Sequence, residues 1–314
     1  MAQIFTLGGR QVTDDLIFPE GPIALDDGSV LVVEIEGGRL IRVAPDGTRS
    51  VAAELGGGPN GAAIGPDGAC YVSNNGGFNW LHAEDGFSRP TGRADHYTGG
   101  SIQRVDLSTG KVEALYTHCD GVSLKGPNDI TFDADGNMWF TDHGKSYDRL
   151  MDRGAIYFAN ADGSFITEVA FPCITPNGIG VSPDGKTLYS TETETGRLWA
   201  WPIIGPGVLA KLPWPSPNGG RFIGGPLGYQ RFDSMALEAN GNICVASLVR
   251  GGISVFSPEG GLIEFWEAPD SFCTNICFGG PDMKTAYITL SGYGRLIAVD
   301  WPRAGMPLIH QQRQ

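Results

Sequence analysis

The sequence predicts an all-β fold made of six repeated units, and three observations support this prediction. A polar residue, an apolar strand, a Gly- or Asp-containing turn and a second strand recur six times, as in PNDITFDADGNMWFTD at 127–142 and PNGIGVSPDGKTLYSTE at 176–192. A third strand that starts at glycine follows most of these units, as in RGAIYFANADG at 153–163. A fourth strand often follows. Six units of up to four antiparallel strands form a six-bladed β-propeller.

The order and spacing of the units predict one domain. The six units start near residues 20, 60, 128, 177, 233 and 275, so residues 1–314 are expected to form a single propeller. The two longest spacings, 68 residues from 60 to 128 and 56 residues from 177 to 233, lie well above the roughly 40–45 residues that a blade requires, which identifies insertions at 75–99 and 214–232. The sixth unit ends near Trp301 without an outer strand of its own. We expect N-terminal residues such as Gln3–Leu7 to supply that strand and to close the ring.

The composition excludes several classes of partner. A formal net charge of −13 argues against nucleic acid, whose phosphates need a basic surface, and against an anionic membrane. A solvated acidic surface or a bound cation would each account for this charge. The N-terminus shows no signal-peptide pattern, and no apolar run approaches the ~18 residues of a membrane span. The six cysteines lack C-x-x-C spacing, and we expect reduced, buried thiols in a cytoplasmic protein.

The starts of the six units form a set of polar positions. The innermost strands of a propeller line its axis, so equivalent positions on the six blades face one small volume. These positions carry only oxygen-bearing side chains: Glu20, Asn60, Asn128, Asn177, Asp233 and Asn275. We call this set the axial ring. For any one asparagine, capping of a strand start is the alternative role.

Two facing carboxylates at a narrow mouth repel each other unless a cation lies between them. The axial ring therefore predicts one divalent cation on the axis. Carboxylates with amide oxygens, without Cys or His, favour Ca²⁺. Mg²⁺ and Mn²⁺ are the alternatives, and Zn²⁺ is less favoured.

The PEG, PND, PNG and FDSM strand starts resemble the gluconolactonase/regucalcin (senescence marker protein) family of six-bladed propellers, which includes staphylococcal lactonases. The resemblance extends from about residue 16 to residue 301. It implies that Glu20, Asn177 and Asp233 bind the metal, and that Asn128 lies beside metal and substrate with Asp129 next to it. Regucalcin-type members carry a substrate-binding Arg just before the Asn-Asp pair, whereas this chain has Lys125-Gly126-Pro127. The resemblance implies a sugar lactone as substrate and a role in carbohydrate metabolism.

Antiparallel pairing places the ends of the second strands on the same face as the axial ring. We therefore expect a second polar ring there, which consists of Glu34, Asn74, Asp142-His143, Thr191-Glu192, Ser247 and Thr289. The two insertions should lie over the metal and bring aromatic side chains to the substrate. The expected substrate-binding residues are Asn60, Asn275, Phe78, Trp80, Phe222 and Tyr229, with His82 and Trp214 nearby. Aromatic faces with few polar groups suit an uncharged sugar lactone, although each aromatic residue could also only pack its own loop.

The expected reaction is hydrolysis of a cyclic ester, with the metal as Lewis acid at the carbonyl oxygen. Asp233 is the first candidate for the general base, with His143 and Asp129 as rivals. No Gly-x-Ser-x-Gly motif supports a serine nucleophile. Two alternatives stay open: a phosphotriesterase- or fluorophosphatase-like hydrolase, and a non-catalytic calcium-binding propeller. The sequence makes no prediction of the oligomeric state.

Overall fold

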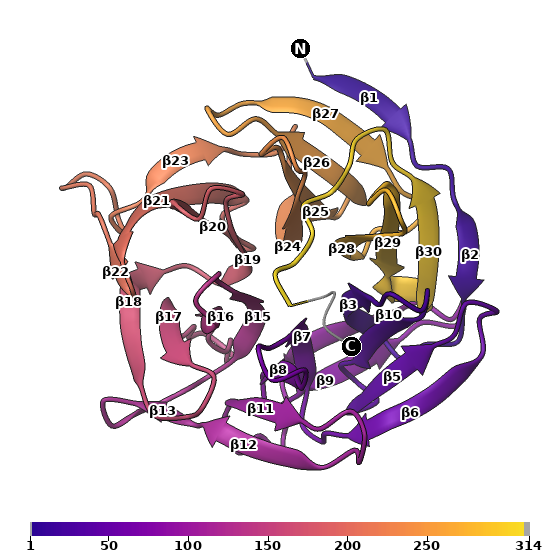
Figure 1. Ribbon diagram of the computed structural model, residues 1–314, viewed down its shortest axis with the longest axis horizontal. Coiled ribbons are helices and arrows are strands. Elements are labelled where there is room, and N and C mark those ends of the chain that lie inside the picture. Colours follow the sequence, from indigo (N-terminus) through magenta and orange to yellow (C-terminus); the bar gives the residue numbers. More distant parts are fainter. Residues whose placement is uncertain (1, 311–314) are drawn as a thin grey trace.

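The computed structural model describes residues 2–310, and six sheets of four or more strands form a ring around a central axis (Figure 1). We call the space along this axis, where two cavities are lined by residues of the innermost strands, the channel. The chain is therefore the predicted six-bladed β-propeller. The innermost strands of the six blades are β3 (Pro19–Ala24), β7 (Pro59–Ile64), β15 (Pro127–Phe132), β19 (Pro176–Val181), β24 (Arg231–Leu237) and β28 (Cys273–Gly279).

Each blade continues outward with two more antiparallel strands. The second strands are β4 (Val30–Glu34), β8 (Cys70–Asn74), β16 (Asn137–Asp142), β20 (Thr187–Glu192), β25 (Ile243–Leu248) and β29 (Thr285–Leu290). The third strands are β5 (Arg39–Val43), β11 (Ser101–Val105), β17 (Gly154–Asn160), β21 (Arg197–Gly205), β26 (Gly252–Phe256) and β30 (Arg295–Asp300).

The outer strands show how the ring closes. Five of them follow within their own blades, at β6 (Arg49–Glu54), β12 (Val112–Tyr116), β18 (Ile166–Cys173), β23 (Arg221–Gly224) and β27 (Leu262–Glu267). The sixth comes from the N-terminus, because β2 (Arg10–Thr13) pairs antiparallel with β30. The expected strand at Gln3–Leu7 was therefore placed wrongly: β1 (Gln3–Thr6) pairs in parallel with β27 of blade five. One N-terminal segment thus joins the last two blades at their outer edges.

The core consists of six apolar clusters, one between each pair of adjacent blades. Between blades three and four, for example, Trp139 and Phe158 pack against Trp199 and Val181. Because both faces of a blade contact neighbouring blades, the second strands are buried along nearly their whole length. This explains why apolar runs such as VLVV are continuous in the sequence, where a half-exposed strand would alternate.

The remaining elements are short. Two hairpins lie outside the blades: β9 (Phe78–His82) pairs with β10 (Ser88–Arg93), and β13 (His118–Cys119) pairs with β14 (Val122–Ser123). Strand β22 (Val208–Leu209) extends blade four, and η1 (Ser291–Tyr293) is a single 3-10 turn. No helix within residues 2–310 is long and apolar enough to cross a membrane. The six cysteines are buried free thiols.

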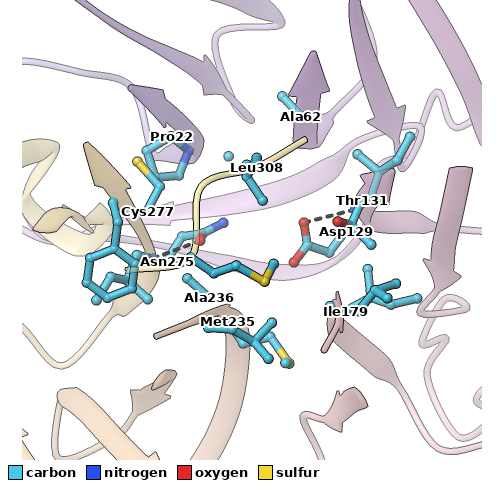
Figure 2. Close-up of a pocket in the computed structure, with 18 residues that line it drawn as sticks. Pro22, Ala62, Asp129, Thr131, Ile179, Met235, Ala236, Asn275, Cys277 and Leu308 are labelled. Carbon is cyan, nitrogen blue, oxygen red and sulfur yellow. Dashed lines mark hydrogen bonds between the residues drawn. The ribbon is translucent and has the colours of Figure 1, made fainter. Parts of the chain in front are cut away.

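The C-terminal segment covers one end of the channel. After β30, the chain forms a backbone hydrogen bond from Met306 N to Leu237 O and then crosses the channel mouth (Figure 2). Met306 and Leu308 line the small cavity of about 60 Å³ at this end, which we call the rear cavity. The opposite end of the channel lies beside the hairpin of β9 and β10, the first insertion.

Candidate metal and substrate site

Five of the six axial-ring residues line one cavity of about 460 Å³, which we call the site cavity. These residues are Glu20, Asn60, Asn128, Asn177 and Asp233. The sixth, Asn275, lies deeper and lines the rear cavity. Its Nδ2 donates a hydrogen bond of 2.6 Å to Oε2 of Glu20. The structure therefore brings together the side chains that the repeat pattern aligned, with Asn275 behind Glu20.

An irregularity of the innermost strands directs these side chains to the axis. In every blade the pairing of the first two strands shifts register at the ring position, as between Glu20 and Ile23 or between Pro127 and Ile130. Such a bulge leaves a residue unpaired and re-aims its side chain. The blades also approach closely here, because a Cβ added to Gly178 would lie 2.9 Å from the backbone oxygen of Asp233. Glycine after the ring residue thus permits the ring to be narrow.

Threonines of the second strands connect neighbouring blades at the site. Thr141 Oγ1 donates to the backbone oxygen of Asn177 at 2.6 Å, and Thr191 Oγ1 donates to that of Asp233 at 2.7 Å. Both hydroxyls are buried side-chain groups whose bonds cross from one blade to the next. They fix the relative position of ring residues on different sheets, which a metal or substrate site requires.

The two acidic side chains of the ring, Glu20 and Asp233, are held in an unfavourable environment. Burial raises the pKa of Glu20 to about 8, against the hydrogen bonds from Asn275 and from the backbone of Gly21. Burial and then the neighbouring charge of Glu20 raise the pKa of Asp233 well above its ordinary value. A cation between these carboxylates would offset both causes.

The donor set fits a divalent cation that prefers oxygen. Within residues 2–310, no group of three or more His, Cys, Asp or Glu side chains comes together, so the candidates are two carboxylates with amide oxygens. Oε1 of Glu20 and Oδ1 of Asn128 are buried and have no hydrogen-bond partner in the part of the chain that the structure describes. Asn177 is oriented by a 3.0 Å bond from its Nδ2 to Thr193 Oγ1. Buried, unpartnered oxygens are costly, and Ca²⁺ takes this type of ligand.

The three candidate bases lie in different places. His143 follows β16 and lines the site cavity beside Asp233 and the other ring residues. Burial lowers the pKa of His143 to about 4, so its imidazole is neutral at pH 7. Asp129 instead lines the rear cavity, where Figure 2 shows its carboxylate at the channel. Its Oδ1 accepts a 2.9 Å bond from Ile130 N, and burial raises its pKa to about 7.

The expected second polar ring is mostly structural. Asp142 accepts hydrogen bonds from the backbone N–H groups of Lys125 and Gly126, at 2.6 and 2.7 Å. The same arrangement recurs where the chain enters three other blades: Ile17 N bonds to Glu34, Gly58 N to Asn74, and Ile174 N to Glu192. The expectation that strand-two ends face the site is therefore wrong for these four side chains. They satisfy backbone donors of the segments that lead into the innermost strands.

The first insertion covers the site cavity as expected, but only part of its aromatic set reaches it. Phe78 of β9 lines the cavity, whereas Trp80 packs behind it on Phe18, with ring centroids 4.8 Å apart. Phe18 does line the cavity. His82 points away and its Nε2 lies 2.9 Å from a Glu36 oxygen.

The second insertion differs more from expectation. Tyr229 lines the site cavity, but residues 221–224 form β23, the outer strand of blade four and the one farthest from the axis. The ring of Phe222 therefore packs 5.7 Å from that of Trp199 at the outer edge of the blade, and it does not contact the site. Trp214 is 90% exposed. The expected roles of Phe222 and Trp214 at the substrate are wrong for this reason.

Three arginines of the site cavity were not identified from the sequence. Arg89 and Arg93 come from β10, and Arg231 begins β24 two residues before Asp233. Arg231 pairs with Glu194, another cavity residue, at 3.1 Å. Arg231 could have been found from its place beside the FDSM motif. Arg89 and Arg93 carry no sequence signal, because the path of the insertion decides where they point.

A buried lysine holds the first insertion against blade three. Lys145 is 1% exposed, and its Nζ donates to Asn75 Oδ1 and to Gly77 O, each at 3.0 Å. Nζ also lies 3.8 Å from the centre of the Phe78 ring. Burial lowers the pKa of Lys145 to about 7, against the attraction of Asp142.

This pKa predicts a pH-dependent contribution to stability. Between about pH 7 and its unfolded value near 10.4, Lys145 binds more protons in the unfolded chain, so rising pH favours the folded state by up to ~1.4 kcal/mol per unit. In Lys145→Met this contribution is lost, while those of other groups are unchanged. We expect the wild type to gain stability relative to the variant between pH 7 and 9 in urea unfolding. If the free energies of unfolding of the wild type and the variant changed in parallel between pH 7 and 9, the Lys145 amine would not be neutralised by burial.

The chain resembles known proteins in both sequence and fold. A profile described as the SMP-30/Gluconolactonase/LRE-like region matches residues 18–292. The chain belongs to this family. Within the SMP-30/gluconolactonase family and its relatives, gluconolactonase of Zymomonas mobilis is 23% identical over 307 residues, which cover 89% of this chain and 78% of that protein. Diisopropyl-fluorophosphatase of Loligo vulgaris is 31% identical over 199 residues, or 59% of this chain and 60% of that protein.

Other matches are shorter or show the fold alone. Lactonase drp35 of Staphylococcus saprophyticus is 30% identical over 136 residues, which cover 43% of this chain and 40% of that protein. The chain thus matches less than two-thirds of drp35 and of the fluorophosphatase. Regucalcin, a calcium-binding protein from Agrobacterium tumefaciens, has a TM-score of 0.73 at 20% identity, covering 98% of this chain and 99% of that chain. A gluconolactonase from Xanthomonas campestris has a TM-score of 0.71 at 21% identity, covering 92% and 88%.

Proposed function

We propose that this protein is a divalent-metal-dependent hydrolase that opens the ester of a sugar-type lactone in carbohydrate metabolism. One observation carries the proposal: the unpartnered, buried oxygens of Glu20 and Asn128 lie with Asp233 in one cavity. Membership of the SMP-30/gluconolactonase family supports the lactone as substrate. The buried free thiols suit a reducing compartment, and we place the enzyme in the cytoplasm.

Glu20, Asn128, Asn177 and Asp233 would hold the metal, with Ca²⁺ as the first choice and Mg²⁺, Mn²⁺ or Zn²⁺ as alternatives. When bound, the metal polarises the carbonyl of the lactone and offsets the negative charge that develops on its oxygen. Asn275 supports this set by its bond to Oε2 of Glu20. Asn60 and Phe78 line the same cavity and would contact the ring of the substrate.

Two side chains in the site cavity can take a proton from the attacking water. Asp233 is the first candidate, because its carboxylate belongs to the axial ring and would lie next to the metal in the site cavity. His143 is the second, because its lowered pKa leaves the imidazole neutral and able to accept a proton at pH 7. Asp129 lies at the rear cavity and is the weakest of the three. Because Asp233 would also hold the metal, the informative variant is His143→Asn: lost turnover with metal binding intact would assign the base to His143, and near-normal turnover would exclude His143 and leave Asp233 as the base.

A second candidate function has its own support. The 31% identity to diisopropyl-fluorophosphatase extends over 199 residues, and the same oxygen ligands could serve the hydrolysis of a phosphorus ester. A direct comparison of a sugar lactone and diisopropyl fluorophosphate as substrates separates the two functions.

Metal removal provides the test. Chelator-treated protein is assayed by pH indicator on sugar γ- and δ-lactones, with Ca²⁺, Mg²⁺, Mn²⁺ or Zn²⁺ restored one at a time. We expect turnover only after one of these is restored. The same metal should raise the free energy of unfolding by about 2.7 kcal/mol at one hundred times its dissociation constant. Metal binding without turnover on any lactone would favour the phosphorus ester or the non-catalytic calcium-binding propeller, and full turnover in the chelator would refute metal dependence.

A further inference from the structure

The wall of the site cavity concentrates positive charge in an otherwise acidic protein. The chain has a formal net charge of −13, and its cavity floor carries Glu20 and Asp233. Nevertheless Arg89, Arg93 and Arg231 all line the same cavity. A neutral sugar ring would not require three guanidinium groups at its binding site, so their presence bears on the substrate.

Arg93 is held by aromatic rings. Its Cζ lies 4.8 Å from the centre of the Tyr147 ring and 5.3 Å from that of Tyr97. Both rings are anchored, since Tyr147 Oη donates to Asp152 Oδ2 at 2.9 Å and Tyr97 Oη donates to the backbone oxygen of Lys125 at 2.5 Å. Stacking uses the face of a guanidinium and leaves the N–H donors at its edge for a ligand. The guanidinium of Arg93 is thus oriented before any ligand binds.

The charges of the three arginines are compensated to different degrees. Arg231 forms an ion pair with Glu194. Within residues 2–310, neither Arg93 nor Arg89 forms an ion pair with a carboxylate. Arg89 donates only a long bond of 3.5 Å to the backbone oxygen of Pro90. Arg93 is therefore the best-oriented uncompensated cation of the cavity, with Arg89 on the same strand as a second one.

We propose that Arg93, assisted by Arg89, binds an anionic substituent of the lactone, a carboxylate or a phosphate. This inference rests on the proposed lactonase function and narrows its substrate class to acidic sugar lactones. The planar fork of Arg matches the oxygens of either group. The expectation of an uncharged substrate, which considered only the aromatic residues, is revised accordingly. Arginines of the hairpin would then take the place of the arginine that is absent before Asn128.

Matched substrates test the inference. D-Glucono-1,4-lactone and D-glucaro-1,4-lactone share a five-membered ring and differ at C6, which is a hydroxymethyl group in the first and a carboxylate in the second. We expect the wild type to prefer the acidic lactone in kcat/KM. Charge-assisted hydrogen bonds are worth about 1.5–3 kcal/mol, so Arg93→Gln should lower this preference by about 10- to 100-fold, mainly through KM. Arg10→Gln, a surface change on β2, is the matched control and should keep the wild-type preference.

A phosphorylated substrate and a direct binding measurement complete the test. 6-Phospho-D-glucono-1,5-lactone, compared with D-glucono-1,5-lactone, decides between a phosphate and a carboxylate as the preferred group. Calorimetric titration of D-glucarate, which has two carboxylates, and of D-gluconate, which has one, measures the site without turnover, and we expect Arg93→Gln to weaken glucarate binding more than gluconate binding. Equal kcat/KM for neutral and acidic lactones, unchanged in Arg93→Gln, would overturn the inference and leave the lactonase standing. Arg93-dependent glucarate binding without hydrolysis of any lactone would instead support the anion site and refute the lactonase.

Discussion

Asp233→Asn is expected to lower kcat/KM for lactone hydrolysis by about 10³-fold, or roughly 4 kcal/mol of transition-state stabilisation. The substitution keeps the size of the side chain and removes its negative charge. It therefore removes both a metal ligand and the first candidate base. The backbone of residue 233 stays fixed, because its oxygen accepts the bond from Thr191.

Although Asp233→Asn should lower activity, it should raise the stability of the metal-free protein. In the protein without metal, burial and the charge of Glu20 disfavour the ionised form of Asp233, so Asp233→Asn should raise the free energy of unfolding at pH 7. In the presence of Ca²⁺ the variant should lose the stabilisation that the wild type gains from the metal. Thermal unfolding with and without Ca²⁺ measures both effects.

Asp135→Asn is the control for Asp233→Asn, since Asp135 lies in the exposed turn between β15 and β16. It should leave activity and metal response as in the wild type. Near-normal turnover of Asp233→Asn, or a variant destabilised without metal, would contradict the arrangement proposed for the ring.

The second large effect is expected at the point where the C-terminal segment meets blade five. Arg303→Met should reduce the free energy of unfolding by about 3–5 kcal/mol, the cost of removing one partner from a buried ion pair. Arg303 Nε donates to Glu238 Oε2 at 2.6 Å, and its other nitrogens bond to both oxygens of Glu264, at 2.9 and 2.7 Å. Glu238 is fully buried, so the variant leaves its charge without the compensating cation.

The pH dependence of this effect has a defined sign. Burial alone would raise the pKa of Glu238, but the hydrogen bonds from Arg303, Trp301 and Asn242 outweigh burial and lower it. A lowered folded pKa contributes stability that is present above the unfolded value and is lost as the pH falls through the folded value. In the variant, burial is no longer opposed by Arg303, so protonation of Glu238 relieves the destabilisation. The difference between wild type and variant should therefore shrink as the pH falls from 7 to 4, starting above the ordinary glutamate pKa of about 4.3.

Urea unfolding at pH 7 and pH 4 measures this difference. Arg250→Met is the matched control, because Arg250 forms an exposed ion pair with Glu267, and exposed pairs contribute only about 0–1 kcal/mol. A loss at Arg303 as small as that at Arg250 would show that the C-terminal segment contributes little to the fold.

The number of blades, their order and the membership of most of the axial ring could be predicted from the amino-acid pattern. These features depend on short-range patterns: strands of four to nine residues, turns that contain Gly or Asp, and a polar residue at each strand start. The symmetry of the propeller then brings the strand starts together, since equivalent positions on its blades must face the same axis. Glu20, Asn60, Asn128, Asn177 and Asp233 could be placed together without any knowledge of packing.

The side chains that surround the ring depend on tertiary packing and could not be predicted in this way. Residues 221–224 complete blade four as its outer strand, which carries Phe222 away from the axis, and β10 folds over the cavity and brings Arg93 into it. Asp142 turns back to bind backbone N–H groups, and β1 pairs with blade five while β2 completes blade six. The physical reason is the same in each case. A strand repeat is encoded in neighbouring residues, but the path of a loop or terminal segment depends on the distant edge or ring against which it packs.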